Sequence, residues 1–258
     1  MGACLGGRAL GNLPRATPTD VWDMKDAFAG ETAFVLGTAP HMARLPDLPR
    51  ALEGKLVFGT NQIFRMLTPS FLCWSDLRGY LDCREHSDAL PCPQVLAFAD
   101  YQVFWSLDSH GRWPHQNPLP QDSYFVLRSS AELRVARPRT FDMLPPYSAG
   151  TVVMDCALQF AFLTGCTRVY LIGCGIIYDG HFYDEPPGTV QVIDKWVRNY
   201  PVVKEVYERH GRKVYNAGLA GGLQTFERVD IRRLLGVRVV DDPRVGTSMR
   251  RAPQPPRN

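Results

Sequence analysis

The chain has 258 residues, 45% of them hydrophobic, and a formal net charge of +3. This length and composition suffice for one globular domain with a substantial core, and the small charge gives no electrostatic case for a nucleic-acid or acidic-membrane partner. Seven scattered cysteines without a Cys-x-x-Cys pair indicate buried free thiols in a reducing compartment, rather than a disulfide framework or a zinc site.

The two ends of the chain differ in composition from its middle. Residues 1–19 carry Gly, Pro and Arg and predict a flexible N-terminus, and residues 244–258 predict a disordered, basic, Pro-rich tail. The opening residues lack the apolar core of a signal peptide, and no run reaches the roughly 18 apolar residues that a membrane span needs. We therefore expect one cytoplasmic domain over residues 20–243, with no membrane span.

Short apolar runs, rich in β-branched and aromatic residues, recur along the domain. They lie at 32–36, 55–59, 70–74, 94–98, 123–127, 168–172, 212–216 and 237–240. Such runs are typical of strands buried on both faces of a parallel sheet. Because helix-like or loop segments separate them, the sequence predicts an α/β fold, with a mostly parallel sheet and helices on both faces.

Two segments predict helices. Residues 150–166 are apolar on nearly every side, with Ser148 or Thr151 as the N-cap and Gly165 as the stop, which indicates a deeply packed helix. Residues 189–210 predict a second helix, bent or broken at Pro201.

The segment 77–122 has a different composition, rich in His, Pro, Trp and Asp. A long irregular stretch inside a domain is more often a lid or binding loop than filler, so we expect a lid or acceptor loop here.

Small, hydroxyl and amide residues follow the ends of the predicted strands and precede the buried helix. In open parallel sheets, ligands bind beyond the carboxyl ends of the strands, and small residues there let a phosphate approach backbone N–H groups. This pattern predicts a nucleotide site. Its residues are Gly37, Thr38, Ala39, Pro40, Asn61, Gln62, Ser148, Ala149, Gly150, Thr151 and Gly173.

Each of these residues also has a purely structural interpretation. Gly37 is equally suited to a tight turn, and Asn61, Asp76 and Ser148 are equally suited to capping a helix. The sequence contains neither a Gly-x-Gly-x-x-Gly fingerprint nor a Gly-Lys-Ser/Thr phosphate loop. His181 is either a solvated loop residue or a functional group placed past a strand end.

The pattern resembles the α-2,3-sialyltransferases of glycosyltransferase family 42 and the related 6-hydroxymethylpterin pyrophosphokinase-like proteins, which share a Rossmann-like core. The turn at 37–41 resembles their Gly-x-Gly-Pro-Ser turn, with Ala39 and His41 as departures. "FGTNQIF" resembles their Asn-bearing turn, "YSAGTVVMDCALQFAFLTGCTRVYLIGCGIIYDG" follows the layout of their buried helix and next strand, and "VYNAGLAGGLQTFERVD" resembles their last core strand. About half the chain, 31–76 and 146–230, is covered.

The resemblance implies a Rossmann-like fold that binds a nucleotide-activated sugar, for example a CMP-linked one, over 37–40, with Asn61 and the helix start also contacting the nucleotide. It implies transfer of the sugar, of sialic-acid type, to a hydroxyl of a carbohydrate or other acceptor. His181 would deprotonate that hydroxyl, and Tyr178 and Tyr183 would stabilise the departing phosphate without a metal cofactor.

Two alternatives remain open at this point. The pyrophosphokinase-like half of the resemblance implies diphosphate transfer from ATP with Mg²⁺, for which Asp76 would be a ligand. The departures at Ala39 and His41 are also compatible with a nucleotide- or carbohydrate-binding protein without catalytic activity.

Overall fold

The structure is a computed structural model. It describes residues 4–5, 8–9, 19–99, 123–128, 151–175, 177–178, 180–183, 191–192, 194–220 and 222–241. Within these residues, no helix is both long enough and apolar enough to cross a bilayer.

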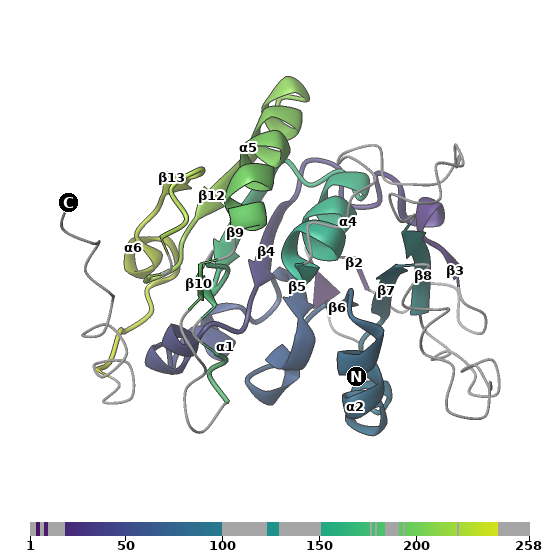
Figure 1. Ribbon diagram of the computed structural model, residues 1–258, viewed down its shortest axis with the longest axis horizontal. Helices are drawn as coiled ribbons and strands as arrows, with labels where there is room; N and C mark the ends of the chain where they lie inside the picture. Colours follow the sequence, from purple (N-terminus) through teal and green to yellow (C-terminus); the bar gives the residue numbers. More distant parts are fainter. Residues whose placement is uncertain are drawn as a thin grey trace, which may run out of the picture.

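The core of the molecule is a nine-stranded sheet in the order β13-β12-β9-β4-β5-β6-β7-β8-β3, which runs from left to right in Figure 1. Every neighbouring pair is parallel. Seven strands have four or more residues: β4 (Thr32–Leu36), β5 (Leu56–Thr60), β6 (Phe71–Trp74), β7 (Gln94–Ala99), β8 (Ser123–Arg128), β9 (Arg168–Ile172) and β12 (Lys213–Asn216). Two-residue strands, β3 (Thr19–Asp20) and β13 (Glu227–Arg228), form the edges. The predicted α/β, Rossmann-like parallel fold is confirmed.

Two further pairs of short strands lie outside this sheet. They are antiparallel and join β1 (Cys4–Leu5) to β2 (Arg8–Ala9) and β10 (Ile177–Tyr178) to β11 (Gln191–Val192).

Seven of the eight predicted strands are present, and the prediction for 237–240 is wrong. Val237 is buried, the N–H of Val240 donates to the carbonyl of Arg44 at 3.0 Å, and Arg238 pairs with Asp47 at 2.7 Å. Val237 and Val239 therefore pack against the helical segments that follow β4, whereas Val240 is exposed. A β-branched run signals a half-buried surface position and does not require a strand.

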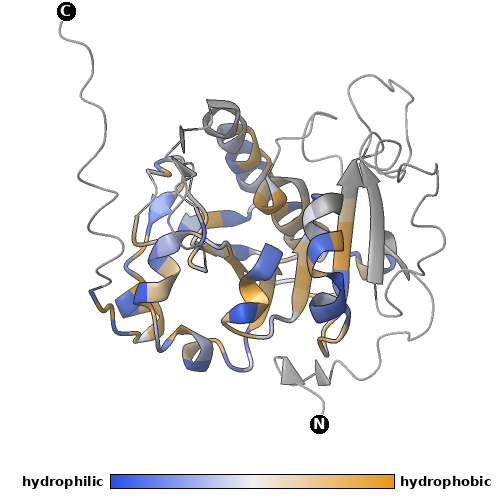
Figure 2. Ribbon diagram, turned by 60° about the horizontal axis from the view of Figure 1, so that its bottom comes forward, coloured by the Kyte–Doolittle hydropathy of each residue, from blue (hydrophilic) through white to orange (hydrophobic). Residues whose placement is uncertain are grey.

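Each face of the sheet has its own core, because successive strand residues point to opposite sides. Ala33 and Val35 pack in one core and Phe34 and Leu36 in the other. Figure 2 shows the central strands largely orange, whereas the helices around them also carry blue segments. The sheet is thus the middle layer of a three-layer structure.

Helical segments cover both faces. The first core contains residues from η2 (Val21–Met24), the π-helix η6 (Val153–Ala157), α4 (Leu158–Leu163) and α5 (Asp194–Arg209). The second contains residues from η3 (Pro40–Arg44), α1 (Leu48–Ala51), η4 (Asn61–Arg65), α2 (Leu77–Asp88) and α6 (Ile231–Leu235).

The predicted buried helix is present, as η6 followed by α4. Thr151 Oγ1 accepts hydrogen bonds from the N–H groups of Val153 (3.1 Å) and Met154 (3.4 Å), and Gly165 ends the helix with φ +89°. The predicted second helix is α5, which begins at Asp194 and continues through Pro201 without a break.

The expectation of an irregular lid is wrong for the first part of 77–122. Residues 77–88 form α2, and 94–99 form β7, which is hydrogen-bonded between β6 and β8. The Pro-, His- and Trp-rich residues that prompted the expectation come after Ala99, and 100–122 lie outside the described residues.

The strand order reverses at β4. From β4 the chain adds β5, β6, β7 and β8 in sequence on one side, and β9 then pairs with the other side of β4. A crevice forms at such a reversal, beyond the carboxyl ends of the two strands, and it is the usual ligand position in open parallel sheets.

Candidate ligand site at the carboxyl edge of the sheet

The turns after β4 and β9 are in direct contact where the strand order reverses. The N–H of Gly37 donates to Ile172 at 2.8 Å, and the N–H of Ala39 donates to Gly173 at 3.2 Å. A Cβ atom on Gly37 would lie 2.2 Å from the Gly173 carbonyl oxygen, and Gly173 itself has φ +70°. Both positions therefore need glycine for backbone packing, and a ligand contact there remains a prediction.

Thr38 links the turn after β4 to the loop that carries His181. Its Oγ1 lies 2.7 Å from Nδ1 of His181, and its carbonyl accepts a hydrogen bond from the N–H of Phe182 at 2.9 Å. Two residues selected independently from the sequence, 143 positions apart, are thus hydrogen-bonded to each other at this edge. The bond fixes the orientation of the imidazole.

Tyr183 and Gln62 lie beside this pair and are joined by a residue that the sequence analysis missed. The rings of His181 and Tyr183 stack, with centroids 4.9 Å apart and an interplanar angle of 15°. The guanidinium carbon of Arg65 lies 5.2 Å from the Tyr183 ring centroid, and its Nε donates to Oε1 of Gln62 at 2.6 Å. One cation therefore contacts two predicted site residues.

Asn61 turns the chain at the end of β5. Its φ of +50° is in the left-handed region, which asparagine tolerates better than most residues, and it begins η4. The preceding Thr60 donates its hydroxyl hydrogen to the carbonyl of Leu36 at 2.8 Å, which ties the ends of β5 and β4 together. Asn61 thus has a structural role, and its predicted ligand contact remains a prediction.

His41 is buried beside the loop that follows β12. Its side chain is 3% exposed, and its Nε2 lies 3.7 Å from where a Cβ atom on Gly218 would be, in the loop after β12. Burial, reinforced by the charges of Arg44 and Arg228, lowers the pKa of His41 from 6.5 to about 4. The departure from the family pattern at this position therefore places a neutral imidazole between two turns.

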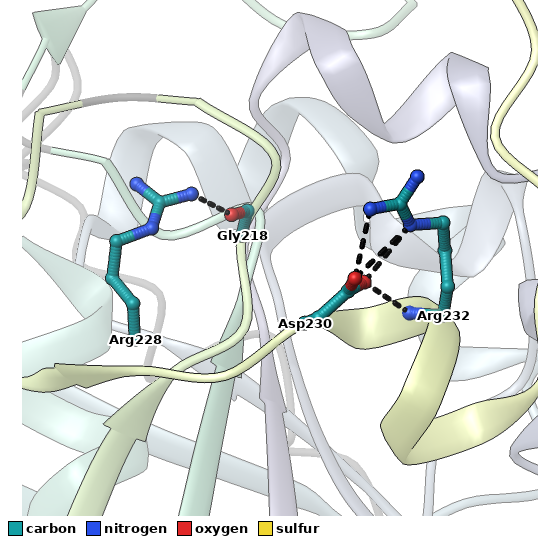
Figure 3. Close-up of polar contacts among 4 residues, drawn as sticks. All are labelled: Gly218, Arg228, Asp230 and Arg232. Carbon is teal, nitrogen blue, oxygen red and sulfur yellow. Dashed lines mark hydrogen bonds and ion pairs between the residues drawn. The ribbon is translucent and has the colours of Figure 1, made fainter.

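The loop after β12 is held by side-chain bonds. Asn216 donates to the carbonyl of Leu223 at 2.6 Å and accepts from the N–H of Gly218 at 3.0 Å. Figure 3 shows that Arg228 donates a hydrogen bond to the Gly218 carbonyl. The nearby Asp230 accepts hydrogen bonds from Arg232 and not from Arg228 in this view. These contacts fix the far side of the carboxyl edge.

Two buried side-chain nitrogens in the described residues lack a hydrogen-bond partner, His41 Nε2 and Trp74 Nε1. His41 lies in η3, five residues after the end of β4, and Trp74 is the last residue of β6, so both lie near the carboxyl edge. Buried polar atoms are normally satisfied by protein, water or ligand. Both nitrogens are buried, so they are not themselves part of an exposed ligand surface.

Thr151 also lies at this edge, on the helix side. The far end of its helix contacts the segment before β4, where the N–H of Gly30 donates to Gly165 at 3.1 Å. The helix start therefore lies at the opposite, carboxyl edge. Within the described residues Thr151 caps its own helix, and Ser148, Ala149 and Gly150 lie outside them.

The structure also describes the positions of Pro40 and Asp76 and the backbone of Tyr178. Pro40 begins η3, and Asp76 is exposed just after β6. Tyr178 belongs to β10, but its side chain lies outside the description. No group of three or more His, Cys, Asp or Glu side chains that could hold a metal is found in the described part of the chain.

Comparisons with known proteins gave one structural match to report. No protein-family model and no curated protein matches the chain. Among solved structures, the sialyltransferase CstII from Campylobacter jejuni, in complex with a substrate analogue, cytidine-5'-monophosphate, aligns with a TM-score of 0.46 and 11% identity, over 78% of this chain and 85% of that chain.

Proposed function

We propose that the carboxyl edge at β4 and β9 binds a nucleotide-activated sugar, and that the protein transfers the sugar to a hydroxyl group of an acceptor. The observation that carries this proposal is the 2.7 Å contact between Thr38 Oγ1 and His181 Nδ1. It puts a histidine beside the turn where the strand order reverses, where a ligand of an open parallel sheet is expected.

His181 has the chemistry of a general base in this proposal. A hydrogen bond at Nδ1 orients the ring, so proton transfer would use the other nitrogen, Nε2. That nitrogen would take the proton of the acceptor hydroxyl as its oxygen bonds to the sugar and the bond from the sugar to the donor phosphate breaks. The hydroxyl of Tyr183, whose ring stacks on His181, would donate a hydrogen bond to the departing phosphate.

Ligand-dependent unfolding tests the nucleotide part of the proposal. CMP is the first probe because the resemblance implies a CMP-linked donor; CDP, UDP, GDP, AMP and ATP are compared, each with and without Mg²⁺. A ligand at a hundred times its dissociation constant adds about 2.7 kcal/mol, which shifts the midpoint by several degrees. We expect CMP to stabilise the protein without metal. An unfolding midpoint that stays the same with every nucleotide as without any nucleotide would contradict the proposal.

The variant His181→Ala tests the catalytic part. Removing a general base lowers turnover about 10²- to 10⁴-fold. We expect that loss in sugar transfer, with CMP affinity nearly unchanged. His86→Ala is the matched control, because His86 is an exposed histidine of α2. Full turnover in His181→Ala would remove His181 from the mechanism.

Diphosphate transfer from ATP is the second candidate, and the position of Asp76 supports it. This carboxylate is exposed directly after β6, at the same edge of the sheet. If it holds Mg²⁺, ATP will stabilise the protein only with the metal, and Asp76→Asn will abolish that stabilisation. A protein that only binds ligands would respond to nucleotide in the first test and show no turnover with any acceptor.

A further inference from the structure

Arg65 is a cation at the candidate site, and its contacts within the described residues are with neutral groups. Its Nε donates to the Gln62 amide at 2.6 Å, and its guanidinium lies over the Tyr183 ring at 5.2 Å. The ion pairs found among the described residues do not include it, whereas Arg84 pairs with Asp88 at 3.0 Å. Its charge is therefore not neutralised by a carboxylate of the described chain.

The position of Arg65 is fixed by the turn that precedes it. Asn61 reverses the chain after β5, and Ile63 of the same turn is buried in the core beneath it. Arg65 itself is exposed, at the end of η4, and meets Tyr183 from the loop after β9. The guanidinium of Arg65 thus lies at the carboxyl edge between η4 and the loop that carries Tyr183. The Tyr183 ring that it contacts also stacks on His181.

The geometry of guanidinium decides what it can bind. Nε is occupied by Gln62, and the two terminal nitrogens make no hydrogen bond within the described residues. These nitrogens form a planar fork that matches two oxygens of a phosphate, and such charge-assisted bonds are about twice as strong as neutral ones. Stacking on Tyr183 lowers the entropy that the side chain loses on binding.

We propose that Arg65 binds a phosphate group of the ligand through its two terminal nitrogens, while Gln62 and Tyr183 hold the guanidinium in place. The identity of the ligand as a nucleotide rests on the proposed function, but the phosphate contact does not. Arg65 would then be the residue that makes the site prefer a nucleotide over the corresponding nucleoside.

The first experiment compares CMP with cytidine, which lacks the phosphate, by calorimetric titration at fixed ionic strength. The measured quantity is the ratio of the two dissociation constants in each protein. In the unmodified chain CMP should bind at least about tenfold more tightly than cytidine. In Arg65→Gln the ratio should fall toward one, because the substitution removes the charge that only the phosphate engages.

Arg84→Gln is the matched control for this titration. It removes an arginine from α2, the helix that contacts η4, but one that already has a carboxylate partner. Its ratio should equal that of the unmodified chain. A full preference for CMP in Arg65→Gln would overturn the inference while leaving the proposed function intact.

The second experiment needs no nucleoside. The Nε–H resonance of Arg65, assigned by its loss in Arg65→Gln, is followed by NMR during titration with inorganic pyrophosphate, and with sodium chloride at matched ionic strength. A saturable shift with pyrophosphate alone supports the phosphate contact, even if CMP and cytidine fail to bind and the proposed function falls. If neither pyrophosphate nor CMP moves the resonance, the inference is wrong.

Discussion

A buried imidazole at position 41 makes stability depend on pH. The pKa of His41 is about 4 in the folded chain, against an ordinary value of 6.5, so the unfolded chain takes up the proton first as the pH falls. This contribution to stability is complete above pH 6.5 and is lost progressively toward pH 4. We expect a loss of about 3 kcal/mol over that range, measured by urea unfolding.

The carboxylates with lowered pKa values act in a separate pH range. Hydrogen bonds from Arg238 and Arg232 lower the pKa of Asp47 and Asp230 to about 2 from 3.8, so their contributions are lost only below about pH 4. His41→Gln should therefore flatten the unfolding profile between pH 4 and 6.5. The same slope in that variant would show that another group is responsible.

Gly37 gives a prediction about backbone packing. An added Cβ would lie 2.2 Å from the carbonyl oxygen of Gly173. Because this oxygen belongs to the backbone, no side-chain rotation can remove the overlap. We expect Gly37→Ala to lower the free energy of unfolding by at least about 2 kcal/mol. Gly79→Ala, in α2, is the control, because its Cβ would make an ordinary 3.5 Å contact with the Asp76 side chain, so the change should be neutral or stabilising. Equal midpoints for both variants would contradict this account.

The start of the helix at 151 gives a prediction for a whole element. Thr151 Oγ1 accepts bonds from the N–H groups of Val153 and Met154 in the first turn, so Thr151→Ala should cost about 1 kcal/mol of unfolding free energy. Thr151→Ser keeps the hydroxyl and should retain most of the stability. If the two variants are equally destabilised, packing of the methyl group rather than capping is the cause.

The elements that could be predicted from the sequence are those with a strong local signal. Apolar, β-rich runs located β4 through β9 and β12, because strands buried on both faces must be apolar throughout. Helix α2 was missed because its polar residues belong to a segment whose later part is Pro- and His-rich. Val237 is buried among helical residues and Val239 packs partly buried beside it, which local sequence does not reveal.

Part of the candidate site could be predicted because ligands of open parallel sheets bind beyond the carboxyl ends of the strands. That rule selected Thr38 and His181, and the structure places them in contact. It did not select Arg65, because an isolated arginine in a polar turn looks like any solvated charge until Tyr183 is seen against it. The orientation of His41 toward Gly218 likewise depends on tertiary packing alone.

At the scale of the whole molecule, the parallel sheet predicts a gradient of hydrogen-exchange protection. β4 and β9 each have a strand on both sides, whereas β13 is a two-residue edge strand whose side chains are exposed. We expect amides of β4 and β9 to exchange at rates set by global unfolding, and those of β13 to exchange orders of magnitude faster. Exchange of β4 as fast as β13 would contradict the central position of β4.

The pairing of β4 with β9 also means that two neighbouring strands are synthesised at very different times. Residues 32–36 emerge early, but their partners at 168–172 emerge only after β5 through β8. Until then one side of β4 is an open, apolar edge, which in other chains invites pairing between molecules. A polypeptide released before residue 168 would expose this edge and would lack His181, so synthesis errors upstream of β9 should leave aggregates rather than partly folded monomers.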